Sequence, residues 1–397
     1  MKRKVCIVTG SRSEYGVLKL LMRRIENDSG LSLQLLATGM HLSKEFGFTY
    51  KEIEKDGFKI NKRIDILLES DKAIGIAKST VKAIEGFAKA YKELKPEIIV
   101  VLGDRFEIFG AAIAAHISRI PIAHIHGGEL TEGAFDDAFR HFITKMSHLH
   151  FTATEEYRKR VIQLGENPKR VFNVGAIGLD NIKKLKLFPK KELENNLNFR
   201  FNKHNFLITF HPVTLENNTS KKQFQNLLNA FKELKDTNII FTKTNADTGG
   251  RIINAMIDSY TKRNKGRAIS FASLGRLRYL STMQYVDAVV GNSSSGIIEA
   301  PSFKIGTINI GDRQKGRIKA DSVIDCNPSK ESILMAFKIL YSKKFQKKLK
   351  DVKNPYGEEG DVSKKIKEII KKRDLSDILK KEFYDIKITN KSISGVT

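Results

Sequence analysis

Short apolar runs alternate with longer stretches of mixed polarity along nearly the whole chain. The short runs, rich in Val, Ile and Phe, predict strands, whereas apolar residues spaced three or four apart predict helices. The predicted strands are 4–9, 31–37, 98–102, 122–125, 150–152, 170–174, 206–210, 238–242, 268–271, 288–290, 307–310 and 323–325. The predicted helices between them include 17–26, 73–94, 106–118, 137–146, 155–164, 222–234 and 249–262. This alternation is typical of α/β proteins with parallel sheets.

The order of strands and helices predicts two doubly wound, Rossmann-like domains. We expect an N-terminal domain at residues 1–185, a C-terminal domain at 186–375 and a polar tail at 376–397. The linker is expected within 179–203, a stretch rich in Lys, Asn and Leu that carries Pro189. Ligands of such folds bind outside the carboxyl ends of the strands, so we expect a site in a cleft between the domains.

Composition narrows the class of protein. The chain is 41% hydrophobic and has no apolar run that could span a bilayer, so no membrane partner is expected. The first apolar run is short and ends at Thr9-Gly10, which favours a first strand over a signal peptide. Cys6 and Cys326 lie far apart in strand-like runs, as expected of buried free thiols in a reducing, cytoplasmic setting.

The net charge of +25, from 70 Lys and Arg against 45 Asp and Glu, raises the question of nucleic acid. The basic residues are spread over many predicted helices, in pairs such as Lys221-Lys222 and Lys347-Lys348, and aromatic residues do not alternate with them. The sequence carries no nucleic-acid-binding motif. We therefore expect a solvated basic surface, a small anionic substrate and no nucleic-acid partner.

The segment Gly291–Glu299 joins an apolar run to a predicted helix through Gly, Asn and Ser residues. Backbone N–H groups at the start of a helix are unpaired and attract phosphate, and a Glu one turn later can accept two ribose hydroxyls. The loop after the next predicted strand, Gly311–Arg317, adds basic and amide side chains beside the same place. The candidate nucleotide-binding residues of these two loops are Asn292, Ser293, Ser294, Glu299, Arg313 and Gln314.

Two loops of the first half follow apolar strands in the same way. Thr9–Gly16 places Arg12 where its guanidinium can bind a phosphate through two hydrogen bonds. The loop lacks the G-x-G-x-x-G spacing of nicotinamide and flavin sites, so no cofactor is expected. At the second strand end, Asp104 can act as an acid or a base beside Arg105, or it can simply cap the next helix.

Histidines and carboxylates cluster in the next segment. His124 and His126 flank one residue, so both are expected on one face of a strand. Zinc is an alternative for such a pair, but neither cysteines nor a spaced His/Glu helix motif joins it, so no metal is predicted. Glu129, Asp136 and Asp137 follow, either as helix-capping residues or as a cluster of carboxylates whose pKa values are driven apart.

Two further polar residues follow strands of the second half. His211 comes directly after the strand at 206–210 and is fixed by Pro212, and Asn245 comes shortly after the strand at 238–242. Both are expected to face the cleft, because the carboxyl ends of parallel strands meet at one edge of the sheet. A single His at a strand end is also a common structural residue, and that alternative stays open.

Taken together, these loops resemble the hydrolysing UDP-N-acetylglucosamine 2-epimerases, the bacterial sialic-acid branch in particular. The resemblance covers most of the chain, and its segments occur in the family's order: Thr9–Gly16, Gly103–Arg105, Gly127–Glu129, Asp136–His141, Asn292–Glu299, Gly311–Arg317 and Asn354–Gly357. It implies two Rossmann-like domains of the glycosyltransferase-B type, no metal or redox cofactor, a UDP-sugar substrate and a homo-oligomer, either a dimer or a tetramer.

The resemblance also implies a reaction. UDP-N-acetylglucosamine would lose UDP by anti elimination, and the resulting 2-acetamidoglucal would take up water to give N-acetylmannosamine for sialic acid biosynthesis. In the family, Asp104 and the pair Asp136 and Asp137 fall at catalytic carboxylate positions, and His211 falls near the phosphates. The nucleotide-binding positions that the resemblance marks are Arg12, Ser293, Ser294, Glu299 and Arg313.

One position departs from the family. Several relatives carry Glu where this chain has His126, so either Glu129 or His126 itself is expected to transfer the proton. Which of Asp136 and Asp137 faces the substrate is open. A nucleotide-linked 2,4-diacetamido-trideoxy sugar, on the way to legionaminic-type acids, is the alternative substrate. A glycosyltransferase of the same fold is the alternative activity.

Overall fold

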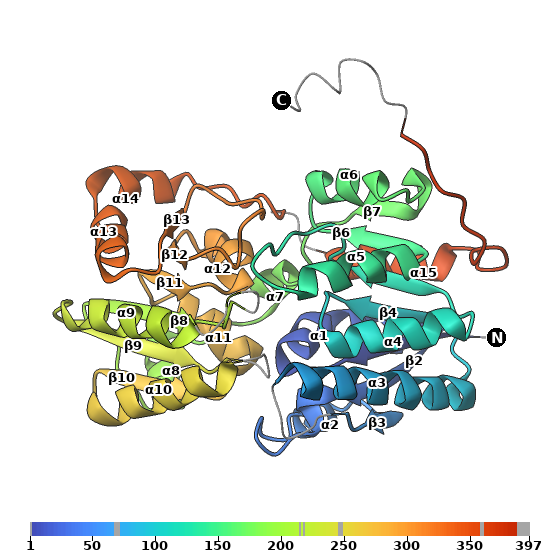
Figure 1. Cartoon of the computed structure of the whole chain (residues 1–397), viewed down its shortest axis with the longest axis horizontal. Helices are drawn as coiled ribbons and strands as arrows, with labels where there is room; N and C mark the ends of the chain where they lie inside the picture. Colours follow the sequence, from blue (N-terminus) through green and yellow to red (C-terminus); the bar gives the residue numbers. More distant parts are fainter. Residues whose placement is uncertain are drawn as a thin grey trace.

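The computed structural model describes residues 2–66, 72–213, 216, 219–244, 249–357 and 361–386. These residues form two parallel β-sheets, each covered by helices on both faces, and the two resulting domains lie side by side (Figure 1). None of the described helices combines the length and the apolar character needed to cross a membrane.

The first sheet is all parallel, in the order β3-β2-β1-β4-β5-β6-β7. Its strands are β1 (Arg3–Thr9), β2 (Leu31–Thr38), β3 (Lys62–Ile64), β4 (Ile98–Leu102), β5 (Ile122–Ile125), β6 (Leu149–Thr152) and β7 (Val171–Asn173). The order reverses between β1 and β4, so the connections after these two strands run to opposite sides and leave a crevice at the carboxyl edge.

Helices bury apolar side chains against both faces of this sheet. One face is covered by α1 (Arg12–Glu26), α2 (Tyr50–Lys55) and α15 (Val362–Lys372). The other is covered by α3 (Ala73–Leu94), α4 (Phe106–Ile117) and α5 (Asp136–Met146). The short helix η1 (Gly39–Leu42) follows β2, and α6 (Glu155–Gln163) and η2 (Pro168–Arg170) lie between β6 and β7.

The second sheet is also parallel, in the order β10-β9-β8-β11-β12-β13. Its strands are β8 (His204–Thr209), β9 (Thr237–Thr242), β10 (Ala268–Phe271), β11 (Ala288–Gly291), β12 (Gly306–Ile310) and β13 (Val323–Cys326). Here the order reverses between β8 and β11, which places a second crevice beside the loop that begins with Asn292.

The helices of the second domain again form two layers. One face packs against α9 (Ser220–Lys232), α10 (Gly250–Arg263), α13 (Lys330–Leu340) and α14 (Lys343–Lys350). The other packs against α8 (Lys190–Leu197) and α11 (Gly275–Met283). Between the two domains, α7 (Leu179–Lys184) and α12 (Ser294–Ile298) share one small apolar cluster, and η3 (Ala300–Phe303) follows α12.

Most predicted strands agree with the structure to within two residues, and three details differ. The strand β3 has only three residues, too few for a periodic apolar pattern, and was not predicted. The expected linker at 179–203 contains α7 and α8. His126 lies beyond the end of β5, so the expectation that it shares a strand face with His124 is wrong.

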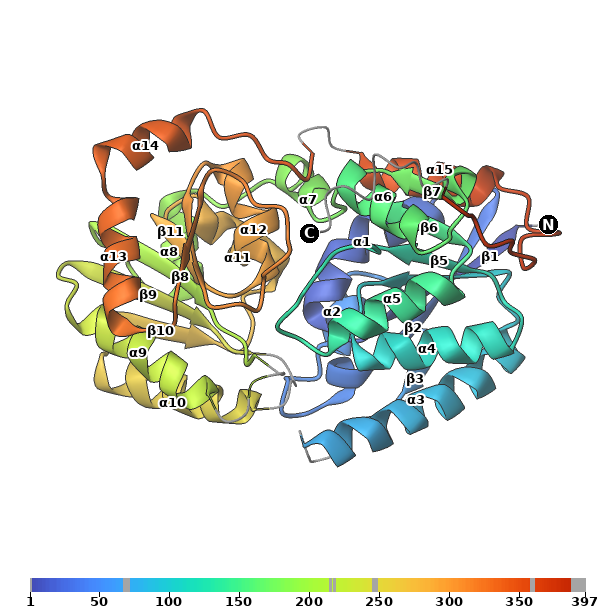
Figure 2. The same cartoon turned by 45° about the horizontal axis from the view of Figure 1, so that its top comes forward.

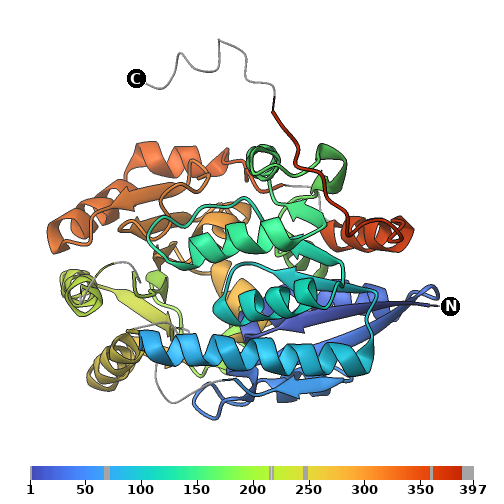
Figure 3. The same ribbon diagram turned by 45° about the vertical axis from the view of Figure 1, so that its right-hand side comes forward.

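The last described segment returns to the first domain. Helix α15 packs against α1 and buries Val362, Ile366 and Ile370 in the core of the first sheet (Figures 2 and 3). Beyond it, Ile378 is buried, and the Arg170 guanidinium donates to its carbonyl at 2.8 Å. We therefore propose that residues 361–386 belong to the first domain, whereas the sequence pattern assigned 186–375 to the second and the rest to a tail.

Candidate active site

A cavity of about 660 Å³ lies between the two domains. Its walls come from the loops after β1, β4 and β5 on one side and after β8, β9, β11 and β12 on the other. These are the carboxyl ends of strands beside the two points where strand order reverses, which is where open α/β sheets bind their ligands. The predicted loops therefore meet around one space.

Most of the residues predicted from sequence line this cavity. They are Arg12, Asp104, Arg105, His126, Glu129, Asp136, His211, Ser293, Ser294, Glu299, Arg313 and Gln314. Asp137 and Asn292 are not part of the lining, although each contacts residues that are. Asn245 lies outside the described residues.

Asn292 connects two strand ends instead of facing the cavity. Its fully buried side chain accepts a hydrogen bond from the His211 backbone N–H at 2.7 Å and donates to the His211 carbonyl at 2.8 Å. Its own carbonyl accepts from Arg313 at 3.0 Å and from Gln314 at 2.9 Å. Asn292 thereby fixes the end of β11 against the end of β8 and orients the two side chains predicted to contact the nucleotide.

The serine loop begins α12 with hydroxyl contacts. Ser293 is the N-cap residue, and its side chain accepts from the Ser295 backbone N–H at 3.4 Å. The Ser295 hydroxyl is in turn hydrogen-bonded to Tyr279 of α11. At the far end of α12, the Glu299 carboxylate is almost buried and pairs with Arg276, which also donates to the Gly178 carbonyl.

Arg12 spans the space between the domains. From the first turn of α1 it donates to the Ser273 carbonyl of the second domain at 3.1 Å, and it forms an ion pair with Glu52 at 2.6 Å. On the opposite wall, His211 shares a hydrogen bond of 2.9 Å between its Nδ1 and the Thr244 hydroxyl. The Arg12 guanidinium and the His211 ring therefore approach the cavity from different domains.

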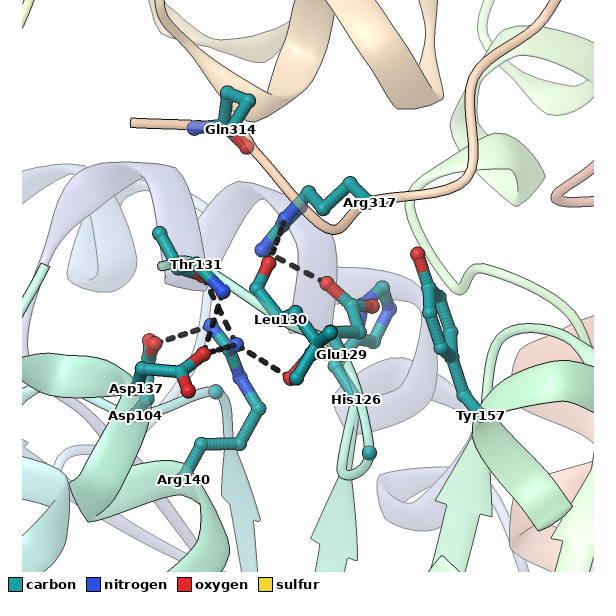
Figure 4. Close-up of polar contacts among 12 residues, drawn as sticks. Asp104, His126, Glu129, Leu130, Thr131, Asp137, Arg140, Tyr157, Gln314 and Arg317 are labelled. Carbon is teal, nitrogen blue, oxygen red and sulfur yellow. Dashed lines mark hydrogen bonds and ion pairs between the residues drawn. The ribbon is translucent and has the colours of Figure 1, made fainter. Parts of the chain in front are cut away.

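Arg140 organises the carboxylates of the first domain (Figure 4). This almost completely buried side chain donates to the Glu129 carbonyl and to the Thr131 hydroxyl, each at 2.9 Å, and forms an ion pair with Asp104. Its contact with Asp137 is longer, at 3.4 Å. Asp104 reaches the cavity from this network while its carboxylate stays paired with the Arg140 guanidinium.

Asp136 and Asp137 open the same helix and take different positions. Asp136 lines the cavity, whereas Asp137 turns toward Arg140, His141 and the Thr131 N–H. Burial acts to raise the pKa of Asp137, but hydrogen bonds from His141 and Thr131 together with the charge of Arg140 outweigh it and lower the pKa. Asp137 therefore acts on the network around it while its neighbour is accessible to a ligand.

His126 and Glu129 form a pair that a residue of the other domain completes (Figure 4). The His126 Nδ1 lies 2.6 Å from Glu129 Oε1, and the Arg317 guanidinium lies 2.9 Å from Oε2. Burial acts to raise the pKa of Glu129, but Arg317 and His126 lower it to about 2. In a neutral ring, the tautomer that donates its Nδ1–H to the ionised Glu129 carries its acceptor lone pair on Nε2.

The backbone presents His126 to the cavity. Its φ is +67°, a left-handed conformation in which His is more common than most other side chains, and its N–H donates to the Phe151 carbonyl at 2.9 Å. Among the described residues, no hydrogen-bond partner contacts its Nε2, and the residue lines the cavity. Side chains held in unusual backbone conformations of this kind cluster at functional sites.

His124 has a different environment. It is fully buried, with Nε2 2.8 Å from the Gly103 carbonyl and Nδ1 3.2 Å from the Thr144 hydroxyl. Burial lowers its pKa to about 3, so the ring stays neutral. Within the part of the chain that the structure describes, no group of three His, Cys, Asp or Glu side chains is placed to hold a metal.

Several charged residues of the cavity were not singled out from sequence, among them Arg140, Arg317, Arg276 and Glu14. Arg140 and Arg317 stand inside segments noted for their carboxylate and basic loop residues, and Arg276 stands in a helix that was not predicted. Glu14 lies two residues after Arg12 in the first loop, at a position typical of a helix-capping residue. The signal for each is a charged residue near a strand end, but the partner that gives it a role lies elsewhere in the chain.

Comparison with known proteins gives consistent matches. The family model described as UDP-N-acetylglucosamine 2-epimerase matches residues 23–371. A Campylobacter jejuni protein named GDP/UDP-N,N'-diacetylbacillosamine 2-epimerase (hydrolyzing) is 47% identical, over 97% of this chain and 100% of that protein. The polysialic acid biosynthesis protein P7 of Escherichia coli is 41% identical, over 97% and 98%.

Among solved structures, the UDP-GlcNAc 2-epimerase of Neisseria meningitidis bound to UDP-GlcNAc superposes with a TM-score of 0.77. It is 19% identical and covers 93% of this chain and 100% of its own. At that identity the match concerns the fold, and it places both parallel-sheet domains in the glycosyltransferase-B arrangement that the sequence predicted.

Proposed function

Because this chain belongs to the UDP-N-acetylglucosamine 2-epimerase family, we propose that it is a hydrolysing 2-epimerase acting on UDP-N,N'-diacetylbacillosamine. The observation that carries the proposal is the single cavity that joins a proton-transfer cluster, Asp104, His126 and Glu129, to the serine loop of the other domain. A nucleotide sugar bound across the domains would present its diphosphate to the loop and its sugar ring to the cluster.

The reaction has two steps. In the first, a base removes the proton from C2 while the C1–O bond to UDP breaks, so that C1 and C2 become joined by a double bond. In the second, the oxygen of water bonds to C1 and a proton is added to C2 from the opposite face. The products are UDP and the free sugar with inverted configuration at C2.

Departure of UDP develops negative charge on its diphosphate. We assign its stabilisation to Arg12, Arg313 and the start of α12 at Ser293, since all three line the cavity and offer hydrogen-bond donors suited to phosphate oxygens. Positioned donors act most strongly where charge builds up in the transition state. His211, whose ring is fixed by Thr244, follows β8 of the same domain as Ser293 and Arg313 and is assigned to the diphosphate as well.

We assign the removal of the C2 proton to His126 Nε2, with Glu129 as the residue that positions it. Both carboxylate oxygens of Glu129 already have partners, His126 and Arg317, so Glu129 is poorly placed to take a proton itself. Asp104, paired with Arg140, is assigned to the water that attacks C1. Asp136 lines the same wall and is assigned to the sugar hydroxyls.

The choice of substrate is supported by identity and by the character of the wall. The Campylobacter relative named for diacetylbacillosamine is 47% identical, against 41% for the Escherichia coli polysialic acid protein. Met40, Phe46 and Leu102 give the first-domain side of the cavity an apolar portion. A sugar with a methyl group at C6 and an acetamido group at C4 presents more apolar surface to such a wall than N-acetylglucosamine does.

The test is a comparison of nucleotide sugars in deuterated water, followed by proton NMR. We expect free 2,4-diacetamido-2,4,6-trideoxymannose, deuterated at C2, together with UDP, and a kcat/KM for UDP-N,N'-diacetylbacillosamine at least about tenfold above that for UDP-N-acetylglucosamine, on the order of 1.4 kcal/mol. The GDP-linked sugar serves as a second arm, because the relative's name includes it.

Other outcomes would point to the alternatives. A preference for UDP-N-acetylglucosamine, with free N-acetylmannosamine as product, would assign the protein to the sialic-acid reaction. A deuterated UDP-sugar without free sugar would show that the hydrolytic outcome is wrong. Transfer of the sugar to an acceptor without exchange at C2 would indicate a glycosyltransferase.

A further inference from the structure

A second, separate pair of carboxyl groups lies beside the cavity, behind the loop after β1. Glu14 of α1 lines the cavity and is 8% exposed, and Glu107 of α4 is completely buried next to it. Glu107 packs so closely on the β1 loop that a Cβ at Gly10 would lie 2.5 Å from its Oε1. The two acids are therefore held together by the packing of α4 against the β1 loop.

One arginine serves both of these acids. The Arg105 Nε donates to Glu107 Oε1 at 2.6 Å and lies 3.8 Å from Glu14 Oε1. Glu14 Oε2 accepts from the Gly10 backbone N–H at 2.7 Å, and among the described residues Glu14 Oε1 has no hydrogen-bond partner. Two neighbouring carboxyl groups with one strong cationic partner cannot both be ionised at low cost, so one of them keeps its proton.

The groups around Glu14 and Glu107 determine which of the two carboxyl groups keeps its proton. Burial, followed by the charge of Glu107, raises the pKa of Glu14 to about 8, and Asp104 adds to this effect while Arg105 and the Gly10 N–H oppose it. His41 of η1, hydrogen-bonded to Thr9 of the same loop at 3.1 Å, has a pKa lowered by burial to about 4 and is neutral. Glu14 is therefore protonated at neutral pH, in a side chain that lines the cavity.

The position of Glu14 matches a need of the reaction. Inversion at C2 requires a base on one face of the sugar and an acid on the other. Glu14 follows β1 and His126 follows β5, and the order β1-β4-β5 puts these strand ends two spacings apart, about 10 Å. A sugar ring above the end of β4 would lie between them. On the His126 side, Glu129 is held ionised by His126 and Arg317, and Asp104 pairs with Arg140.

We propose that Glu14 is the acid that adds the proton to C2 of the glycal, on the face opposite His126. The inference rests on the proposed 2-epimerase function. The double-bond electrons of the glycal take the Glu14 proton, the oxygen of water bonds to C1, and the second proton of that water goes to Asp104. Before the next turnover, Glu14 regains a proton from solvent while His126 and Asp104 release theirs.

A purely structural role for Glu14 makes a different prediction. In the sequence Ser11-Arg12-Ser13-Glu14, Ser11 Oγ accepts from the Glu14 N–H at 3.4 Å, so Glu14 also belongs to a helix-capping arrangement. Glutamine at position 14 can keep the hydrogen bond from Gly10 through its amide oxygen, but it cannot deliver a proton to carbon. Glu14→Gln therefore separates capping from acid catalysis.

The experiment follows single turnovers of Glu14→Gln by proton NMR and by UDP release, with whichever nucleotide sugar the wild-type protein consumes. We expect UDP to be released with the glycal accumulating, while formation of the 2-epimerised sugar falls at least about a hundredfold. Glu26→Gln, at the exposed end of the same helix and paired with Arg23, is the control and should match the wild type.

A pH profile gives an independent readout without changing Glu14. In the wild type, the rate of glycal hydration should fall as pH rises through about 8, because Glu14 then loses its proton. The rate of the elimination step should not show this decrease. Glu107→Gln removes a negative charge that raises the pKa of Glu14, so the decrease in the hydration rate should occur at lower pH. This measurement remains informative if Glu14→Gln proves too unstable to study.

The outcomes separate the two claims. If the wild-type protein releases no UDP from any of the nucleotide sugars, the proposed function fails. If the wild type reacts but Glu14→Gln forms the epimerised sugar at a normal rate, Glu14 is not the acid. Equal loss of UDP release and of epimerised sugar, or a decrease in the hydration rate that Glu107→Gln leaves at the same pH, would also overturn the inference.

Discussion

At the scale of single residues, two glutamates of one cavity are held in opposite charge states. Glu129 has Arg317 and His126 as partners, which lower its pKa to about 2. Glu14 shares one arginine with another buried acid, and its pKa rises to about 8. The side chains are identical, so the difference comes entirely from which charges surround them. This division supplies an ionised group that orients a base and a neutral group that can act as an acid.

Glu129→Gln tests the first half of that division. The folded-state pKa of Glu129 is depressed, so its contribution to stability is present above pH 4.5 and is lost as pH falls toward about 2. The variant should lose this part of the acid dependence, and at neutral pH it should be less stable by about 3 kcal/mol, because Arg317 keeps a buried charge without its partner. Urea unfolding between pH 2 and pH 7 measures both effects.

The same variant should lower kcat at least about a hundredfold, since His126 Nδ1 loses the carboxylate that fixes its proton. Glu132→Gln is the matched control, because Glu132 is nearly half exposed and pairs only with Lys315. Its stability should change by less than about 0.5 kcal/mol. An acid dependence that is unchanged in Glu129→Gln would contradict the charge state assigned here.

At the scale of elements, α15 depends on a residue far away in sequence. No side chain of its own N-terminal residues caps this helix. Instead the buried Asp180 accepts from the backbone N–H groups of Asp361, Val362 and Ser363 at 2.7 to 2.9 Å. Asp180 lies in α7, which connects the two domains, so the cap fixes the start of α15 to the interdomain connection.

Asp180→Asn should loosen α15 and leave the rest of the fold in place. One carboxylate oxygen would become an amide that faces the Ser363 donors, and the expected cost is about 1–2 kcal/mol. Hydrogen exchange should show faster exchange across residues 362–372. As control, Ser342→Ala removes the N-cap of α14 in the other domain and should affect only that helix. Unchanged protection of α15 would show that its packing on α1 alone holds it.

At the scale of the whole molecule, residues of the second domain complete the proton-transfer site of the first. Arg317 contacts Glu129 and also donates to the Leu130 carbonyl at 3.1 Å. Arg12 reaches the Ser273 carbonyl in the reverse direction. The proposed chemistry therefore depends on contact between the two domains, which would also keep the reactive glycal from escaping before water adds to it.

Two arginines of one loop should have separable effects. Arg317→Gln should reduce kcat at least about tenfold and change the Kd for UDP by less than about threefold, because Arg317 acts on Glu129. Arg313→Ala should weaken UDP binding at least about tenfold, on the order of 1.4 kcal/mol, because Arg313 lies beside the serine loop. Calorimetry with UDP and steady-state kinetics measure the two effects. The reverse pattern would exchange the roles of the two residues.

Local patterns predicted much of this molecule. Most strands, and the order of loops that surround the cavity, follow from apolar runs and from the polar residues at their ends. The ends of individual strands and the contact partners of individual side chains could not be predicted from these local patterns. Asn292 stands in the serine loop like a ligand contact, yet its amide groups pair with the backbone of His211. A one-residue difference in where β5 ends separates His124, buried and neutral, from His126 at the cavity.

The sequence by itself determined the fold class, the two second-domain loops that line the cavity and most of the arginine and carboxylate positions, because these depend on short-range periodicity and on which residues end each strand. Only the tertiary structure decided which carboxylates are charged, which domain α15 joins and which arginine completes Glu129. Those properties depend on contacts such as Glu129 with Arg317 and Glu14 with Glu107, between residues that the chain brings together only when its two sheets are formed and packed.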